Sequence, residues 1–280
     1  MTIDRSRQQD LAAAFGRKHR DGPMIVLPNA FDVASARVVA RHDPVAIGTT
    51  SAAIAAGLGY RDGEHAPRDE MLAAVSRIVA SVDVGVTADI EAGYGDDEIT
   101  VVTTIERVLE AGAIGINLQD TGNPKGRWSD GLLPLERAAE KIAVARAAAD
   151  AAGVSVVINA RTDTFLAPDV DPVDEAIRRG NAYLSAGANC VFAPGIFDRD
   201  GIARVVHELA GPLNVYAVRG TPTVDELTRL GVRRVSVGCG PYQACLALVE
   251  RVTAQLLGEG RYDAFLDEHL PYGEMVDLLA

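Results

Sequence analysis

The sequence predicts an α/β protein folded as a (β/α)8 TIM barrel, for three reasons. Short apolar runs rich in β-branched residues alternate eight times with longer segments of helical period. The apolar runs are nearly continuous, which is typical of parallel strands buried on both faces. Several helical segments end at a glycine, as in EAGA (110–113) and SAGA (185–188), where a helix turns back towards a strand.

The expected elements follow one another in regular order along the chain. Strands are expected at 24–29, 45–50, 84–91, 114–120, 154–162, 189–195, 213–220 and 234–240. Helices are expected at 32–41, 67–81, 97–111, 135–152, 171–186, 198–210, 223–230 and 241–257. Thr223 and Pro134 are typical residues for the start of two of these helices. An open doubly wound sheet is the main alternative, but no GxGxxG motif follows the first strand.

Two segments lie outside the eight strand–helix units. A helix is expected at 4–18, before the first strand, and RYDAFLDEHLPYGEMVDLL (261–279) forms a C-terminal helical extension. These additions could cap the barrel or reach a neighbouring subunit. Because no linker or low-complexity tract interrupts the sequence, we expect one domain over residues 1–280.

The composition narrows the class of protein. The formal charge is −12 and no basic run is visible, so we expect neither a nucleic-acid partner nor a membrane surface. No apolar stretch has transmembrane length, and the first residues lack the apolar core of a signal peptide. The three cysteines, Cys190, Cys239 and Cys245, are too scattered for a disulfide framework. We therefore expect a reducing, cytoplasmic setting, with each cysteine a small buried hydrophobic residue.

Polar residues collect at the ends of the expected strands, where a (β/α)8 barrel forms its active site. They are Asn29, Thr49, Thr50, Ser51, Asp89, Glu91, Gln119, Asp120, Asn159, Arg161, Asp163, Asn214, Tyr216 and Arg219. Any one of them could simply meet water or cap a helix, and for Asp120 and Asp163 that explanation is at least as good. The convergence of Asp89, Glu91, Gln119 and Arg161 on one mouth instead favours a shared site.

The residue types at this mouth indicate a hard metal ion. In TADIEAGYG (87–95) Asp89 and Glu91 would share one side of a strand, and such close carboxylates need a cation, a proton or a basic group between them. Carboxylate and amide oxygens suit Mg2+, with Mn2+ possible, better than Zn2+. Arg161 suits a bidentate grip on a carboxylate or phosphoryl group of a small-molecule substrate.

Two loops add further candidates. SAAIAAGLGYRDG (51–63) is rich in small residues, which leave backbone N–H groups free to approach an anion, and Asp62 at its end could fold back to the mouth. TGNPKGRWSDG (121–131) has the composition of a mobile lid that carries Lys125 into the site. A solvated loop with an ordinary surface lysine is the alternative for the second loop.

Five motifs together resemble the isocitrate lyase/phosphoenolpyruvate mutase superfamily over nearly the whole chain. They are LPNAFDVASAR (27–37), AIGTTSAAIAAGLGYRDG (46–63), ADIEAGYG (88–95), NLQD (117–120) and NARTDTFL (159–166). The resemblance implies a (β/α)8 barrel whose last helix is swapped between subunits, in a homo-oligomer that is a tetramer or a helix-swapped dimer. It also implies chemistry on a C–C or P–C bond next to a 2-oxo acid, with Mg2+ stabilising the enolate.

The resemblance assigns roles to individual residues. Asp89 would bind the metal directly, Glu91 would hold metal-bound water, and Gln119 would lie beside the metal. Asp62 matches the carboxylate at the end of the second-strand loop, and Pro124-Lys125 match the gating loop of the mutases. The substrate-binding positions are Thr50, Ser51, Ala52 and Arg161, to which we add Asn214 on the seventh strand.

Several positions depart from the superfamily patterns. Gln119 replaces a glutamate, and the lyase loop KKCGH or KRCGH, with its cysteine acid, is absent. The mutase continuation TNS after the Pro-Lys is replaced by GRW. Pro194 stands where mutases place histidine and lyases place glutamate. The metal half of the chemistry is therefore retained, whereas the specificity half matches neither branch.

The leading hypothesis is a Mg2+-dependent lyase that cleaves a C–C bond of a small 2-hydroxy- or 2-oxo-dicarboxylic acid through a metal-stabilised enolate. The substrate would resemble isocitrate or methylisocitrate, or oxaloacetate, whose decarboxylation needs fewer specialised groups. Asp62, or a water held by Glu91, would be the base, and Lys125, Tyr94 or water would be the acid. The alternatives are a phosphonopyruvate mutase or hydrolase, and a catalytically silent protein that binds 2-oxo acids.

Overall fold

The computed structural model describes residues 3–122, 131–167, 171–266 and 269–279, and its centre is a closed parallel barrel. The strands are β1 (Ile25–Leu27), β2 (Asn29–Ala30), β3 (Ile47–Thr49), β4 (Val86–Asp89), β5 (Gly115–Gln119), β6 (Val157–Arg161), β7 (Cys190–Phe192), β8 (Leu213–Tyr216) and β9 (Arg234–Ser236). β1 and β2 are two halves of one strand separated at Pro28, which has no N–H to donate. β1 pairs with β9 and β2 pairs with β3, so eight strand positions close the ring. The predicted TIM barrel is confirmed.

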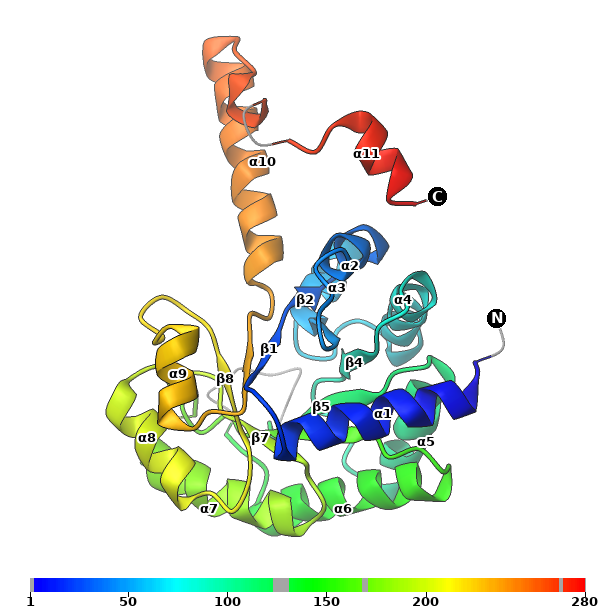
Figure 1. Cartoon of the computed structure of the whole chain (residues 1–280), viewed down its shortest axis with the longest axis vertical. Coiled ribbons are helices and arrows are strands. Elements are labelled where there is room, and N and C mark those ends of the chain that lie inside the picture. The colour runs from blue at the N-terminus through cyan, green and yellow to red at the C-terminus, as the bar shows by residue number, and fades with distance from the viewer. Residues whose placement is uncertain (1–2, 123–130, 168–170, 267–268, 280) are drawn as a thin grey trace.

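The helices surround this barrel (Figure 1). They are α1 (Arg5–Arg20), α2 (Val33–Ala40), α3 (Ser51–Leu58), α4 (Arg68–Ser81), α5 (Glu98–Glu110), α6 (Leu135–Ala151), α7 (Pro172–Ser185), α8 (Arg199–Glu208), α9 (Val224–Leu230), α10 (Gly240–Glu259) and α11 (Tyr272–Asp277). α3 was not predicted as a helix. No helix in the described ranges combines the length and apolar character needed to cross a membrane.

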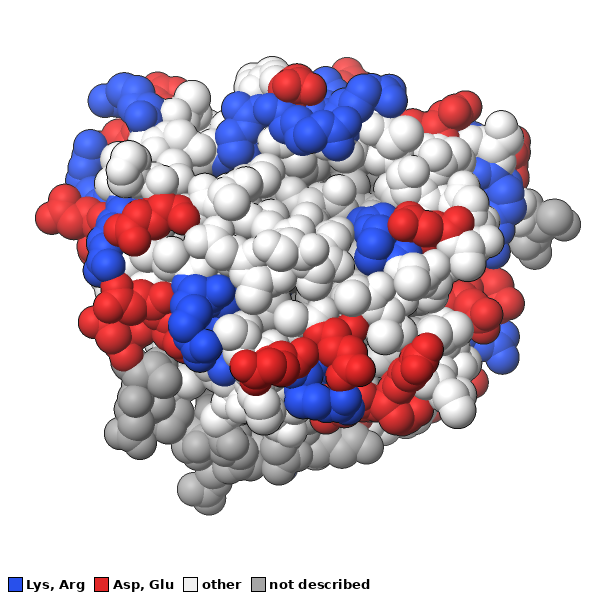
Figure 2. All heavy atoms as spheres, turned by 90° about the horizontal axis from the view of Figure 1, so that it is seen from below, with Lys and Arg blue, Asp and Glu red and all other residues white. Residues whose placement is uncertain are grey.

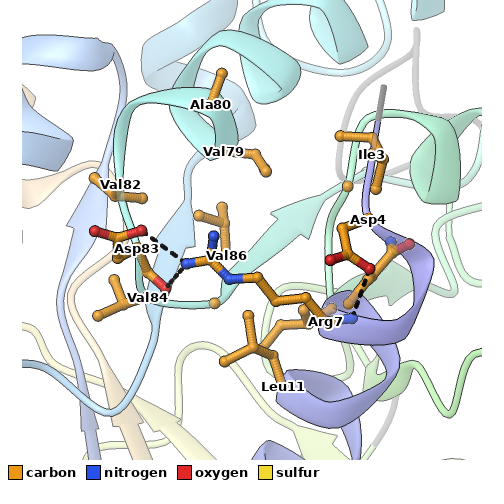
Figure 3. Close-up of a pocket in the computed structure, with 14 residues that line it drawn as sticks. Ile3, Asp4, Arg7, Leu11, Val79, Ala80, Val82, Asp83, Val84 and Val86 are labelled. Atoms are coloured by element: carbon orange, nitrogen blue, oxygen red, sulfur yellow. Dashed lines mark hydrogen bonds and ion pairs between the residues drawn. The ribbon is translucent and has the colours of Figure 1, made fainter. Parts of the chain in front are cut away.

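α1 is fixed to the end of the barrel where the strands begin. Gln8 donates hydrogen bonds to the carbonyls of Leu109 and Ala113, at 3.2 and 2.7 Å. Arg7 donates to the carbonyl and carboxylate of Asp83, and this pair borders a pocket of about 280 Å³ among valine side chains (Figure 3). This pocket lies at the N-terminal end of β4, the end away from a barrel's usual active site.

α10 extends away from the barrel (Figure 1), and none of its residues is buried. Leu246, Val249 and Leu257 are 51%, 60% and 81% exposed. After α10 the chain returns to the barrel, where Arg37 of α2 donates a hydrogen bond to the Leu278 carbonyl and Leu278 is buried. The C-terminal extension thus packs on α2, whereas α10 contributes no buried side chain to its own barrel.

Candidate active site

A cavity of about 310 Å³ lies at the C-terminal ends of the barrel strands. It is lined by nine residues that the sequence placed at this mouth: Asn29, Thr49, Thr50, Ser51, Ala52, Asp62, Asp89, Arg161 and Tyr216. These residues come from the ends of five strands and from the segment after β3, so the closure of the barrel brings distant parts of the sequence together. Of the other polar residues expected at the mouth, Asn159 is fully buried and Arg219 is exposed, and neither lines the cavity.

Asp89, the last residue of β4, is held against the start of α3. Its Oδ2 accepts hydrogen bonds from the backbone N–H of Ser51, at 3.1 Å, and from Ser51 Oγ, at 2.8 Å. The Asp89 N–H donates to Thr49 Oγ1 at 2.9 Å. A carboxylate at the N-terminus of a helix is stabilised by the helix dipole. The Ser51 N–H, one of the amides of the small-residue segment 51–63, therefore orients Asp89.

Glu91 differs from the prediction, which placed it on the same strand face as Asp89. β4 ends at Asp89, and Glu91 lies in the following turn with a left-handed φ of 53°. It is 3% exposed, and its Oε2 accepts a hydrogen bond from the Glu64 N–H. The strand alternation therefore does not extend to Glu91, because the chain turns before reaching it.

The acidic groups near Asp89 have raised pKa values. Burial, then the charges of Asp62 and Asp89, raise the pKa of Glu91 to about 8. Burial, then the charge of Asp89, also raise the pKa of Asp62. These are the shifts expected of carboxylates that share a buried space, and a bound cation would reverse them.

Glu64 is a site residue that the sequence reasoning missed. Its Oε1 accepts a hydrogen bond from the Tyr94 N–H at 2.6 Å, while its own N–H holds Glu91. Glu64, Glu91 and Tyr94 all have left-handed φ values, of 58°, 53° and 66°. Such conformations cost non-glycine residues free energy and are often found at functional sites. The sequence signal that could have identified Glu64 is its position two residues after Asp62.

Arg161 ends β6 and its guanidinium is oriented by a neighbour. Its Nε donates to Asp163 Oδ1 at 2.6 Å, and Asp163 Oδ2 accepts from Thr121 Oγ1 at 2.7 Å. Asp163 therefore orients a cavity-lining residue. Asp120, by contrast, is buried and accepts hydrogen bonds from Thr162, Tyr183 and Arg179, which ties β5 to α7.

Four of the residues with assigned roles do not line this cavity, and a fifth lies outside the described residues. Gln119 is buried and its N–H donates to the Glu91 carbonyl. Asn214 is fully buried and bonds to Ser236 Oγ, which does line the cavity. Tyr94 packs against an apolar cluster around Ile54, where burial raises its pKa above the usual range. Glu91, described above, is the fourth, and Lys125 lies outside the described ranges.

Residues that were not expected to contribute to the site also line the cavity. Leu166 and Phe192 form an apolar wall together with Pro194, the position that departs from the superfamily patterns, and Cys239 lies beside Tyr216. The expectation that all three cysteines are buried is wrong: Cys190 is buried, Cys239 is half-buried and Cys245 is exposed on α10. The rule that polar residues at strand ends face the site applies equally to the eighth expected strand and could have identified Cys239.

The residues present fit a hydrated divalent cation. Asp89 lines the cavity, and the Oε1 atom of buried Glu91 has no hydrogen-bond partner among the described residues. Over the ranges that the structure describes, no three His, Cys, Asp or Glu side chains form a closed metal site. Mg2+ commonly keeps several waters and takes only one or two carboxylates directly, so this open arrangement suits it.

Comparisons with known proteins agree with this geometry. The family model described as phosphoenolpyruvate phosphomutase matches residues 15–257. A 2-methylisocitrate lyase from Escherichia coli K12 is 28% identical, covering 79% of this chain and 76% of its own. An oxaloacetate decarboxylase from Pseudomonas putida GB-1 is 29% identical, covering 87% and 84%.

A solved structure of a 2,3-dimethylmalate lyase superimposes with a TM-score of 0.82 at 25% identity, covering 97% of this chain and 94% of its own. That structure is described as a PEP mutase/isocitrate lyase superfamily member. The chain therefore belongs to the phosphoenolpyruvate phosphomutase family, within the isocitrate lyase/phosphoenolpyruvate mutase superfamily that its motifs predicted.

Proposed function

We propose that the protein is a Mg2+-dependent lyase that cleaves a C–C bond of a small 2-hydroxy- or 2-oxo-dicarboxylic acid. The observation that supports this most directly is that Asp89, Asp62 and Arg161 line one cavity. A carboxylate that holds the metal, a second carboxylate that acts as the base and a cation that binds the substrate carboxylate are groups that such a cleavage needs.

Each residue has a defined part in this reaction. Arg161, oriented by Asp163, binds a substrate carboxylate, and Thr50 and Ala52 line the cavity beside it. Asp89 would hold Mg2+ directly, with Glu91 and Asp62 acting through water. When bound, Mg2+ supplies positive charge beside the oxygen that becomes negative as the C–C bond breaks.

Asp62 is the base that takes the proton from the 2-hydroxyl group. Its pKa is raised by burial and by Asp89, which brings its proton affinity closer to that required near neutral pH. It also lines the cavity, so no rearrangement of the chain is needed to reach a bound substrate. For oxaloacetate, which has no 2-hydroxyl, this step is not required.

The apolar wall favours C–C over P–C chemistry. Leu166, Phe192 and Pro194 offer no charge to a phosphonate, and Arg161 is the sole basic residue among the described residues that line the cavity. A short alkyl substituent on the distal carbon suits such a wall. The names of the E. coli and P. putida relatives agree with this choice.

A product assay tests the proposal. The purified protein with Mg2+ would be incubated with isocitrate, 2-methylisocitrate, 2,3-dimethylmalate, oxaloacetate and phosphonopyruvate, with an EDTA control for each, and products would be identified by mass spectrometry. We expect cleavage of a hydroxy acid or of oxaloacetate that EDTA abolishes. Turnover of phosphonopyruvate alone would contradict the proposal and indicate P–C chemistry.

We also infer that α10 packs against another copy of the chain. Its stripe of exposed Leu246, Val249 and Leu256 is left uncovered by the described residues of its own subunit, and the outward-facing Val26 of β1 is 49% exposed. Both surfaces would be buried if α10 were exchanged between subunits. This inference supports a homo-oligomer.

A further inference from the structure

The wall of the cavity carries a thiol that the reaction described above does not use. Cys239 lines the cavity together with Asp89 and Arg161, and its Sγ lies 3.7 Å from the hydroxyl of Tyr216, which also lines it. Cys245, by contrast, is exposed on the side of α10. The two cysteines are six residues apart, about 1.7 turns of helix, and only Cys239 lines the cavity.

The turn before Cys239 is held in place by hydrogen bonds to Asn29 and by packing against the Tyr216 ring. Asn29 Oδ1 accepts hydrogen bonds from the N–H groups of Val237 and Gly238, at 3.0 and 2.8 Å. Gly238 has a φ of 49°, and a Cβ atom there would lie 2.7 Å from the Tyr216 ring. A glycine is therefore needed for the Tyr216 ring to pack against this turn, which keeps the phenol and the thiol together.

The reaction needs a proton donor at the cleaved carbon. The chain lacks the lyase loop cysteine, Tyr94 does not line the cavity, and Lys125 lies outside the described residues. Among the described hydroxyls that line the cavity, Ser51 already donates to Asp89. Serine and threonine hydroxyls are also much weaker acids than thiols and phenols. Apart from Asp62, the proposed base, Cys239 and Tyr216 are the described cavity-lining side chains with a suitable proton.

The surroundings favour the thiol as donor and the phenol as its partner. Cys239 is the N-cap residue of the 20-residue helix α10, whose dipole stabilises the thiolate that remains after proton transfer. Burial, then the hydrogen bond with Cys239, raise the pKa of Tyr216 to about 12. Tyr216 therefore keeps its proton and can donate a hydrogen bond to the sulfur.

We propose that Cys239 is the catalytic acid, donating its proton to the carbon that keeps the electron pair of the broken C–C bond. That carbon is C3 of the pyruvate enolate when oxaloacetate loses CO2, and the α-carbon of the released carboxylic acid when a 2-hydroxy acid is cleaved to a 2-oxo acid. There the electron pair forms a C–H bond as the S–H bond breaks. The thiolate accepts a hydrogen bond from Tyr216 and regains a proton from water, so no oxidant or reductant is needed. This inference rests on the proposed lyase function and names the acid that it requires.

The reverse of this step gives a direct test. Pyruvate, the product of oxaloacetate decarboxylation, and succinate, the acid released from isocitrate or 2-methylisocitrate, are each incubated with the protein and Mg2+ in D2O. Loss of the protons next to the carbonyl or carboxyl group is followed by NMR, and the acid that exchanges identifies the carbon that is protonated. We expect the wild-type protein to catalyse exchange, and Cys239→Ala and Cys239→Ser to slow it at least about 100-fold. Tyr216→Phe should slow it less, and Cys245→Ala, the matched control, should leave it unchanged.

Oxalate binding with Mg2+, measured by calorimetry, separates a catalytic from a structural role, because oxalate has no carbon to protonate. We expect both Cys239 variants to bind oxalate as wild type does. Exchange within twofold of wild type in Cys239→Ala would overturn the proposal, and so would loss of oxalate binding in both variants. Wild-type protein that binds oxalate without exchanging either pyruvate or succinate would also overturn it. Failure of the wild type to bind oxalate would instead contradict the proposed function.

Discussion

Arg161 and Asp163 stand two positions apart, and the second determines how the first can act. The 2.6 Å hydrogen bond from Arg161 Nε to Asp163 fixes the plane of the guanidinium at the cavity wall. Asp163 is itself held by Thr121 and is nearly inaccessible to solvent. A buried charged hydrogen bond of this kind contributes more to orientation than an exposed ion pair does.

Asp163→Asn should therefore weaken substrate binding without removing the catalytic groups. Loss of a charged hydrogen bond of about 1.5–3 kcal/mol predicts a roughly 10- to 100-fold higher Kd for oxalate in the presence of Mg2+. Calorimetry measures this directly, and Asp200→Asn on the solvent side of α8 is the matched control. An unchanged Kd in Asp163→Asn would show that Arg161 is oriented by other contacts.

The buried imidazole of His19 makes the stability of the whole barrel depend on pH. It is fully buried in α1, its Nδ1 lies 2.9 Å from the Phe15 carbonyl, and its Nε2 has no partner among the described residues. Burial, then the charge of Arg234, lower its pKa from 6.5 to about 3. Folding therefore keeps this imidazole neutral at a pH where the unfolded chain would bind a proton.

The free energy of unfolding should fall as pH decreases from about 6.5 to 3. In that window the unfolded state binds one more proton at residue 19 than the folded state, which contributes a slope of up to about 1.4 kcal/mol per pH unit. Urea unfolding at several pH values should show a smaller slope for His19→Gln than for wild type. His207→Gln, at an exposed position in α8, is the control. Equal slopes in wild type and His19→Gln would contradict this account.

At the scale of elements, the eight strand–helix units could be predicted because their physical signals are local. Apolar β-branched runs and glycine C-caps identify strands and helix ends without any tertiary information. α3 was missed because SAAIAAGL, made largely of small apolar residues, has no polar face to mark a helical period. The end of β4 was placed two residues too late because Glu91 adopts a left-handed conformation that its residue type does not signal.

Only part of the candidate site could be predicted from the sequence. Residues at strand ends, such as Asp89 and Arg161, are brought together by the barrel itself. Glu64 and Cys239 lie in turns outside the strands. Asn214 is buried, and its hydrogen-bond partner Ser236 lines the cavity instead. These details depend on tertiary packing, which the sequence pattern does not encode directly.

The exposed apolar stripe along α10 gives a prediction about the assembly of subunits. Leu246→Lys combined with Val249→Lys would put two charges on the stripe that we infer to be covered by another subunit. Burial of each such side chain stabilises an interface by about 1.5–3 kcal/mol, so the double variant should dissociate into smaller species. Light scattering would detect this, with Arg251→Glu, an exposed position on the opposite face of the same helix, as the control. An unchanged molar mass, or a monomeric wild type, would contradict the inferred packing of α10.

At the scale of the whole molecule, an acidic chain is expected to bind an acidic substrate. The net charge is −12, and acidic and basic side chains are interspersed on the face shown in Figure 2. Attraction of a dicarboxylate must therefore come from local groups, namely Arg161 and the Mg2+ ion that we propose at Asp89. This requirement makes the metal the central element of the account.

The measurement that tests this most directly is the binding of oxalate by calorimetry, with Mg2+ and with EDTA, in wild type and in Asp89→Asn. Oxalate resembles the planar 2-oxo acid portion of the proposed substrates. The account predicts binding by the wild type only when Mg2+ is present, and at least about tenfold weaker binding by Asp89→Asn, which lacks the charge that holds the cation. Equal binding in EDTA, or unchanged binding by Asp89→Asn, would contradict a metal site at Asp89.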